Sequence, residues 1–216
     1  FLFEGSEKKR INYNKLKKRK MVKENRELMA EARASLSGNW GLAVGTFLVY
    51  IIIVGTLQVI PVVGSVIGLF IAGPMAVGIC MFTLSLSRNE NARLEQIFEG
   101  FRNYGTVLGA YLLMVLFIFL WALLLIIPGI IAAFAYSQTF YILAEDDTIG
   151  SMDALKKSKE MMDGYKWKYF CLGLRFIGWA LLCILTLGIG FLWLSPYIQI
   201  SYAKFYEDLK NNQAVS

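Results

Sequence analysis

The 216-residue sequence contains no histidine, and this absence removes several kinds of active site at once. A serine–histidine–aspartate triad and the zinc site of an HExxH motif both require histidine. The sequence also lacks a glycine-rich loop followed by lysine and serine or threonine, the pattern that holds nucleotide phosphates. We therefore expect that the chain is not an enzyme and that it needs no cofactor.

Cysteine is scarce as well. Cys80, Cys171 and Cys183 are the three cysteines of the chain, and no CxxC motif is present. A structural zinc site or a disulfide framework needs more ligands or closer pairs than these. All three lie in long apolar stretches, where a free cysteine behaves as a small apolar side chain. We interpret them as packing residues and expect no bound metal.

Charge is missing from three long blocks. Residues 41–86 and 105–144 contain no Asp, Glu, Lys or Arg, and residues 169–203 contain only Arg175. Of all residues 18% are charged, whereas soluble domains carry about a quarter. Each block is long enough for two helices that cross a hydrocarbon layer of ~30 Å. The absence of carboxylates from the blocks also excludes an aspartyl intramembrane protease. The expected fold is all-α, a polytopic membrane protein with six transmembrane helices.

Glycine and proline divide each block into two helices. The expected helices are 41–60, 64–86, 105–127, 129–144, 169–187 and 191–206. They are paired by short apolar turns at 61–63, at Pro128-Gly129 and at 188–190. Pro74 is expected to kink the second helix and Ser195-Pro196 to interrupt the sixth, because proline removes a backbone hydrogen bond.

A short amphipathic helix is expected before each block. Its apolar positions recur at helical spacing, and a glycine and an aromatic residue follow it. The apolar faces are Leu28, Met29, Ala32 and Leu36; then Leu94, Ile97, Phe98 and Phe101; then Met152, Leu155 and Met162. The aromatic residues Trp40, Tyr104 and Trp167 are 64 and 63 residues apart. We therefore expect three hairpins in a pseudo-threefold internal repeat, with units 26–90, 91–147 and 148–210 in one domain over 26–210.

The basic residues indicate orientation. Residues 1–27 hold ten Lys or Arg and four Glu, which equals the whole net charge of +6. A basic tail is compatible with a nucleic-acid arm, a contact to lipid headgroups or an orientation signal; beside a first membrane helix we favour the last two and expect no nucleic acid partner. The positive-inside rule places both termini and the three amphipathic helices in the cytoplasm. Residues 1–25 are expected to form a disordered tail, 1–20 being an upstream extension before Met21, and 211–216 a polar tail.

Arg175 is the single charged residue within an apolar block, about 10 Å from the expected interface at Lys168. One interpretation is snorkelling to the lipid headgroups. The other is a site within the membrane, where Arg175 contacts an anion or pairs with Glu145 or Asp146. Polar residues at membrane depth either line a cavity with it or form hydrogen bonds between helices. The candidate set is Ser137, Gln138, Ser195, Pro196 and Gln199.

A second candidate set suits the headgroups of anionic lipids. It consists of Lys156, Lys157 and Lys159 on the third amphipathic helix, Lys166, and the aromatic residues Trp40, Tyr104 and Trp167. The small-residue pairs Gly41–Gly45, Gly64–Gly68 and Gly105–Gly109 are expected to allow close packing of helices within the chain.

Nine short stretches together resemble a family of bacterial membrane proteins, the domain of unknown function 975. They are Ala34–Trp40, Ile97–Phe101, Ile127–Ile130, Tyr141–Asp146, Ala154–Lys159, Gly164–Trp167, Phe176–Trp179, Gly188–Gly190 and Phe205–Leu209. The architecture is more loosely similar to the membrane domain attached to some glycerophosphodiester phosphodiesterases. The resemblance implies a six-helix inner-membrane protein and supplies no activity and no catalytic residues.

Two functions follow from these features as hypotheses. The first is a protein that binds or transports a lipid or another small amphipathic molecule, with membrane lipids, or a peptide, as ligands. The alternative is a scaffold or accessory protein for envelope stress or peptide immunity, which docks a cytoplasmic protein partner through its amphipathic helices.

Overall fold

The computed structural model describes residues 23–57 and 61–214, and within these ranges the chain consists of helices joined by turns and short loops, with no strand. The expectations for residues 1–22 lie outside the described residues. The helices are α2 (Asn25–Leu36), α3 (Trp40–Leu57), α4 (Pro61–Ser87), α5 (Gln96–Glu99), α6 (Tyr104–Leu124), α7 (Ile126–Ala135), α8 (Thr139–Glu145), α9 (Ser151–Met161), α10 (Lys166–Leu185) and α11 (Phe191–Ala214).

Four stretches of helix are long and apolar enough to cross a membrane. They are Val66–Ser87 in α4, Tyr104–Leu124, Ile126–Glu145 across α7 and α8, and Lys166–Leu185. α3 makes a fifth when it is taken together with α2, from which it is bent by 97°. α11 is not among them because Lys204, Glu207 and Asp208 make its second half polar. The expectation of an all-α chain with several apolar helices is confirmed.

The outward surfaces of α6 and α10 are strongly apolar. Only 11% of each apolar stretch is buried inside the protein. At one end of these helices Leu123, Ile126, Leu185 and Leu187 are each more than 70% exposed. A soluble protein rarely leaves so large an apolar surface uncovered. These surfaces therefore indicate that the protein is associated with a membrane.

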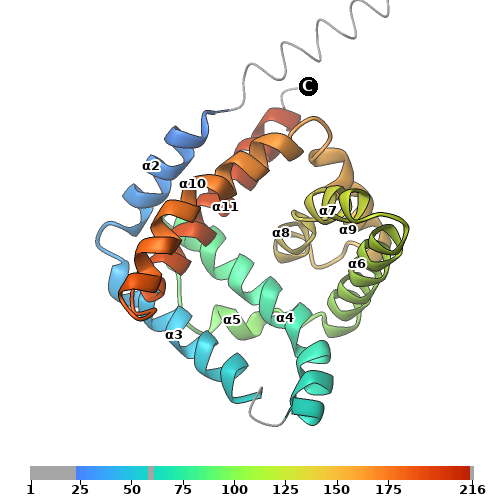
Figure 1. The fold of residues 1–216 in the computed structure, drawn as a ribbon, viewed down its shortest axis with the longest axis horizontal. Helices are drawn as coiled ribbons and strands as arrows, with labels where there is room; N and C mark the ends of the chain where they lie inside the picture. Colours follow the sequence, from blue (N-terminus) through green and yellow to red (C-terminus); the bar gives the residue numbers. More distant parts are fainter. Residues whose placement is uncertain (1–22, 58–60, 215–216) are drawn as a thin grey trace, which may run out of the picture.

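α4 lies at the centre of the arrangement. It runs through the middle of the molecule between α3 and α6 and also packs against α8 and α11 (Figure 1). Because it has protein neighbours on several sides, half of its apolar stretch is buried. The other apolar helices surround it and turn their outer faces away from the protein.

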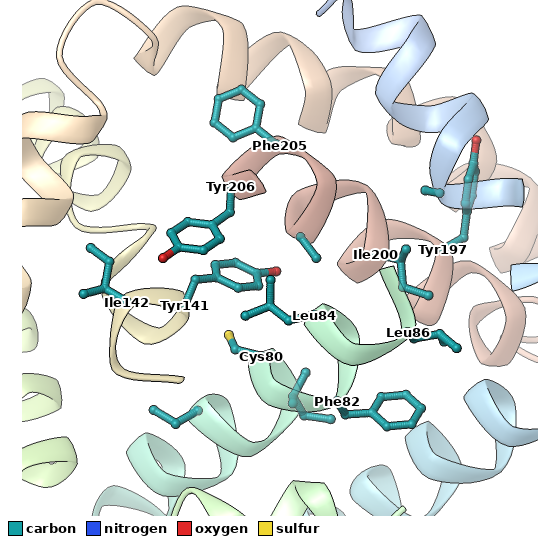
Figure 2. Close-up of a cluster of buried hydrophobic side chains, with 14 of the residues drawn as sticks. Cys80, Phe82, Leu84, Leu86, Tyr141, Ile142, Tyr197, Ile200, Phe205 and Tyr206 are labelled. Carbon is teal, nitrogen blue, oxygen red and sulfur yellow. The ribbon is translucent and has the colours of Figure 1, made fainter. Parts of the chain in front are cut away.

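An aromatic cluster joins α4, α8 and α11. The rings of Tyr141 on α8 and Tyr206 on α11 stack with centroids 5.2 Å apart, and Cys80 of α4 lies beside them (Figure 2). Tyr169 of α10 stacks on Tyr202 of α11 at 4.7 Å, which extends the cluster to a fourth helix. Cys80 and Cys183 are buried and Cys171 is half-buried, with all three thiols free. Large buried aromatic side chains therefore fix α11 against the centre of the protein.

Two glycines allow backbone contact between α4 and the segment of α5. A Cβ atom added to Gly78 would lie 2.0 Å from the carbonyl oxygen of Ile97. One added to Gly100, directly after α5, would lie 2.0 Å from the carbonyl oxygen of Pro74. The expected glycine pairs behave differently: Gly41, Gly45, Gly68 and Gly105 have no other atom within 4 Å of such a Cβ. The prediction that those pairs serve close packing within the chain was wrong for these four positions.

The expected fourth apolar helix is two helices. It begins at Ile126 rather than Gly129, so Pro128 lies in the first turn of α7, where its missing N–H is tolerated. It breaks between Ala135 and Thr139. At the break, the buried Ser158 of α9 accepts the backbone N–H of Gln138 at 3.1 Å and donates to the carbonyl of Ala135 at 2.9 Å. One hydroxyl therefore satisfies two backbone groups that the break leaves open.

We predict that Ser158→Ala lowers the free energy of unfolding by about 1–3 kcal/mol, because a buried N–H and a buried carbonyl lose their partner. Thermal unfolding in detergent measures the effect as a fall in Tm of roughly 2–10 °C. The matched control is Ser195→Ala, since Ser195 is half-buried and forms no side-chain hydrogen bond to the described residues. Equal Tm values for the two variants would contradict the role of Ser158.

The amphipathic helices agree with expectation to different degrees. α2 buries Leu28, Ala32 and Leu36, as predicted. α5 is only four residues long, and Phe98, on the predicted apolar face, is 46% exposed. α9 buries Leu155, whereas Met152 at its first turn, also on the predicted apolar face, is 41% exposed. Phe98 and Met152 therefore lie outside the buried core.

Neither proline inside a long helix ends that helix. α4 continues through Pro74, and α11 continues through Pro196 as far as Ala214. The expected interruption at Ser195-Pro196 was therefore wrong, and residues 211–214, expected in a polar tail, are the last turn of α11. Each proline removes one backbone hydrogen bond, but the tertiary contacts on both sides hold the helix in one piece.

Candidate functional site

Arg175 lies in a groove between α2, α10 and α11. The groove has a volume of about 450 Å³ and is lined by Arg26, Met29, Ala30, Arg33, Arg175 and Tyr197. The four α2 residues are spaced i, i+3, i+4 and i+7, so they share one helical face. That face is opposite in character to the buried one, since Arg26 and Arg33 are exposed. Three arginines from two helices thus meet around one concavity.

Tyr197 of α11 forms the floor of this groove and is itself firmly held. Its hydroxyl donates to the carbonyl of Met29 at 3.3 Å, and its ring meets that of Phe176 edge-on at 5.4 Å. The guanidinium of Arg33 lies over the face of the same ring, 5.6 Å from its centroid. This cation–π contact orients Arg33 without neutralising its charge.

An apolar slot continues from the groove. It has a volume of about 190 Å³ and is lined by Arg33, Trp40, Trp179, Cys183, Gly190, Trp193, Leu194 and Tyr197. Arg33 and Tyr197 line both spaces, so the two are adjacent. Along α10 the lining passes from Arg175 to Trp179 and Cys183 in steps of four residues, about 6 Å each. The slot therefore extends along α10 and α11, away from Arg175.

The electrostatics of the groove are unbalanced. None of the described residues that line it is acidic. Within residues 23–57 and 61–214, no ion pair reaches Arg26, Arg33 or Arg175. On α2 the nearby carboxylates are engaged elsewhere: Glu31 pairs with Lys23, and Glu27 accepts the N–H of Glu24. The arrangement can therefore bind an anion, with apolar material beside it.

The acidic partners considered for Arg175 have other contacts. Glu145, at the end of α8, is bonded to Arg88, Lys210 and Tyr206. Asp146 accepts the backbone N–H of Thr148 at 3.1 Å and its hydroxyl at 2.6 Å, and these bonds lower the pKa of Asp146. Pairing of Arg175 with either acid is therefore not seen.

The predicted polar set is divided between two places. Ser137 and Gln138 lie in the break between α7 and α8, where the amide Nε2 of Gln138 donates to Ser137 at 2.8 Å. Pro196 and Ser195 precede Tyr197 on α11, and the backbone carbonyl of Gln199 accepts the Tyr141 hydroxyl at 3.3 Å. None of these five lines the groove, and of the set only Arg175 does so. The contacts of Ser137, Gln138 and the Gln199 carbonyl are hydrogen bonds between and within helices.

The predicted headgroup residues are mostly exposed. Lys156, Lys157 and Lys159 are exposed on α9, Trp167 is 72% exposed, Tyr104 is 38% exposed and Lys166 is half-buried. Trp40, Tyr104 and Trp167 each lie in the first turn of an apolar helix, as expected. Trp40 differs from the other two because it lines the apolar slot.

An ionic cluster lies at the polar ends of α4, α8 and α11, away from the groove. Glu145 accepts from Lys210 at 2.6 Å and from the Tyr206 hydroxyl at 2.7 Å, and it pairs with Arg88. Arg88 in turn donates through Nε to Glu207 at 2.9 Å. The carboxylate of Glu145 is only 13% exposed, so these contacts are partly shielded from solvent. The cluster ties the ends of three helices together.

A second polar contact holds α2 against α11. Asp208, with a side chain 6% exposed, accepts the backbone N–H of Lys23 at 3.0 Å and pairs with Lys168 at 3.5 Å. Burial raises the pKa of Asp208, while the positive charges of Lys168 and Lys23 act in the opposite direction. Asn25 adds a bond from its side-chain amide to the carbonyl of Lys168 at 2.9 Å. These contacts fix the α2 side of the groove.

Most residues of the groove and the slot were not predicted as site residues from the sequence. Arg175 and Trp40 were among the predicted site residues, whereas Arg26, Arg33, Trp179, Trp193 and Tyr197 were not. The signal for two of them was present, because Arg26 and Arg33 are seven residues apart on one helical face. Nothing in the sequence shows that this face meets Arg175, since that contact joins segments about 140 residues apart.

Comparison with known proteins identifies the family. No curated protein and no solved structure matches the chain. The family model DUF975, described as a protein of unknown function, matches residues 21–132 and 123–213. These ranges include the arginine groove, the apolar slot and the ionic cluster. The chain therefore belongs to the DUF975 family of proteins of unknown function.

Proposed function

We propose that this protein binds an anionic amphipathic molecule, such as a membrane lipid, in the arginine groove and the slot beside it. The observation that carries the proposal is the meeting of Arg26, Arg33 and Arg175 around one concavity, where the lining contains no carboxylate among the described residues. The concavity is continuous with a slot lined by indole rings. Guanidinium groups bind phosphate in bidentate fashion, and indoles pack against apolar chains. An anionic amphipathic molecule needs a cationic surface for its headgroup directly beside an apolar surface for its hydrocarbon chain.

The position of α2 supports a ligand taken from the membrane. α2 is bent by 97° from α3, so it lies in the plane of the interface when α3 crosses the bilayer. The face of α2 that carries Leu28, Ala32 and Leu36 packs on the core. In this orientation Arg26 and Arg33 lie at the level of the lipid headgroups. Arg175, about two and a half turns into α10, reaches the same level by extending its long side chain toward the headgroups.

The proposed membrane topology has six crossings as three hairpins, α3–α4, α6–α7/α8 and α10–α11, with both termini in the cytoplasm of a bacterial inner membrane. In support, the two helices of each hairpin pack against each other. Gly38 and Gly164, which precede α3 and α10, have similar left-handed φ values of 85° and 81°. Gly100 in the middle unit has a φ of −60° and serves the contact with α4 instead. The groove supports the proposal that the protein binds a ligand; it does not bear on transport of that ligand.

We predict that Arg175→Gln removes bound lipid. The variant keeps a polar side chain of similar length but loses one of three charges, so retention of co-purified lipid should fall at least about tenfold. Native mass spectrometry of protein released gently from detergent measures the lipid adduct. Arg93→Gln, which removes an exposed arginine that does not line the groove, is the matched control and should retain the adduct. An adduct of equal intensity in both variants would contradict the proposal.

The alternative is a scaffold that docks a cytoplasmic partner through α9. It is favoured by one observation: Lys156, Lys157 and Lys159 are exposed while Ala154, Leu155 and Ser158 fix the opposite side. Reversal of the three lysines to glutamate discriminates between the functions. A scaffold would lose its partner in a pull-down from membranes, whereas the lipid adduct of the groove would be unchanged.

A further inference from the structure

The groove and slot also restrict which amphipath fits. We infer, on the basis of the proposed function, that the ligand is a single-chain phosphate monoester lipid. Its dianionic phosphate binds Arg26, Arg33 and Arg175. Its hydrocarbon chain enters the slot lined by Trp40, Trp179 and Trp193. The inference concerns the headgroup charge and the number of chains, neither of which follows from lipid binding alone.

The headgroup charge follows from the number of arginines. Three arginines line the groove, and none of the other described residues that line it is a carboxylate. A phosphate diester carries one negative charge, whereas a monoester carries about −1.5 to −2 at pH 7 because its second pKa is near 6. A monoester also presents three terminal oxygens, enough to accept from all three side chains. Charge complementarity therefore favours the monoester.

The chain number follows from the size of the slot. Its volume is about 190 Å³. An enclosed cavity of 150 Å³ in another protein holds one benzene molecule, so the slot holds part of one hydrocarbon chain, and a second chain would lie outside it. The slot begins at Arg33 and Tyr197, which also line the groove, so a chain attached to the bound phosphate enters it directly.

The pH dependence of binding near pH 6 should come from the ligand, because none of the described residues that line the groove is a histidine or a carboxylate. The charged groups that face the phosphate are Arg26 and Arg33 on α2 and Arg175 on α10, and α11 contributes the Tyr197 hydroxyl, which is bonded to Met29. Arginine stays charged throughout this range. Affinity for a monoester should therefore fall as its phosphate takes up a proton below about pH 6.

The test measures the affinity of the purified full-length protein in detergent for four probes: hexadecyl phosphate, lysophosphatidylglycerol, phosphatidate and inorganic phosphate. We expect hexadecyl phosphate to bind about tenfold more tightly than the diester lysophosphatidylglycerol at pH 7.5, and this preference to shrink severalfold at pH 5. Phosphatidate, a two-chain monoester, should bind more weakly than hexadecyl phosphate. Trp179→Ala should weaken hexadecyl phosphate at least fivefold, while Trp121→Ala on the exposed face of α6 should not.

The other possible outcomes would overturn the inference alone, or the proposed function as well. Equal binding of the monoester and the diester, or of phosphatidate and hexadecyl phosphate, would overturn this inference and leave the proposed function in place. Displacement of hexadecyl phosphate by inorganic phosphate at similar concentration would show a site for free phosphate and overturn the lipid as its source. Failure of all three lipids to bind would overturn the proposed function as well.

Discussion

Gly78→Ala and Gly100→Ala are expected to abolish or severely reduce the yield of folded protein. In each variant the new methyl group would lie 2.0 Å from a backbone carbonyl oxygen, of Ile97 or of Pro74 respectively. A backbone atom cannot rotate away as a side chain does, so α4 and the α5 segment must separate. We expect a loss of more than about 3 kcal/mol in the free energy of unfolding, at or above the usual range for overpacking. In detergent this corresponds to a fall in Tm of at least roughly 6–12 °C.

The control variants are Gly45→Ala and Gly68→Ala. Both glycines are helical, and an added Cβ has nothing within 4 Å. Alanine is the better helix former by about 1 kcal/mol, so these variants should be as stable as the unmodified protein or more so. If Gly78→Ala and Gly45→Ala unfold at the same temperature, the close contact between α4 and α5 does not exist.

Glu145→Ala should be the most destabilising single change in the ionic cluster. It removes the shared acceptor of Arg88, Lys210 and Tyr206 from a site that is 13% exposed. We expect a loss of about 2–3 kcal/mol, because the buried Tyr206 hydroxyl loses its partner and two cations lose theirs. Thermal unfolding at low and at high salt measures the effect. High salt screens exposed charges more than buried ones, so the difference from the unmodified protein should persist at high salt.

The matched control for Glu145→Ala is Glu160→Ala. Glu160 is exposed on α9, and none of the ion pairs among the described residues involves it. Its replacement should change Tm by about 1 °C or less. A Glu145→Ala protein as stable as Glu160→Ala would show that the cluster does not hold α4, α8 and α11 together.

The helices were predictable from the sequence to the extent that burial is local. The apolar blocks and the buried face of α2 follow from the absence of charge and from helical spacing. The break at Tyr136 to Gln138 did not follow, because it depends on Ser158, twenty residues away, for its hydrogen bonds. The roles of the glycines were also reversed: spacing singled out Gly41 and Gly45, but packing uses Gly78 and Gly100.

The residues of the candidate site were even less predictable from the sequence than the helices. Arg175 was conspicuous because it is alone in an apolar block, yet its neighbours are set by tertiary structure. Its groove needs α2 to lie across α11, which depends on the contacts of Tyr197 with Met29 and of Asp208 with Lys23. No spacing rule connects residues so far apart in the chain. Likewise Glu145, considered as a partner for Arg175, pairs instead with Arg88 and Lys210.

The most direct measurement locates the bound ligand. Hexadecyl phosphate with a photoactivatable group on its chain can be crosslinked to the protein in detergent and the labelled peptides identified by mass spectrometry. We expect label on the residues of the slot, at Trp40 on α3, Trp179 on α10 and Trp193 on α11. This label should be lost in the Arg26→Gln, Arg33→Gln, Arg175→Gln triple variant. Label spread over the exposed faces of α6 and α7, unchanged in the triple variant, would contradict this expectation.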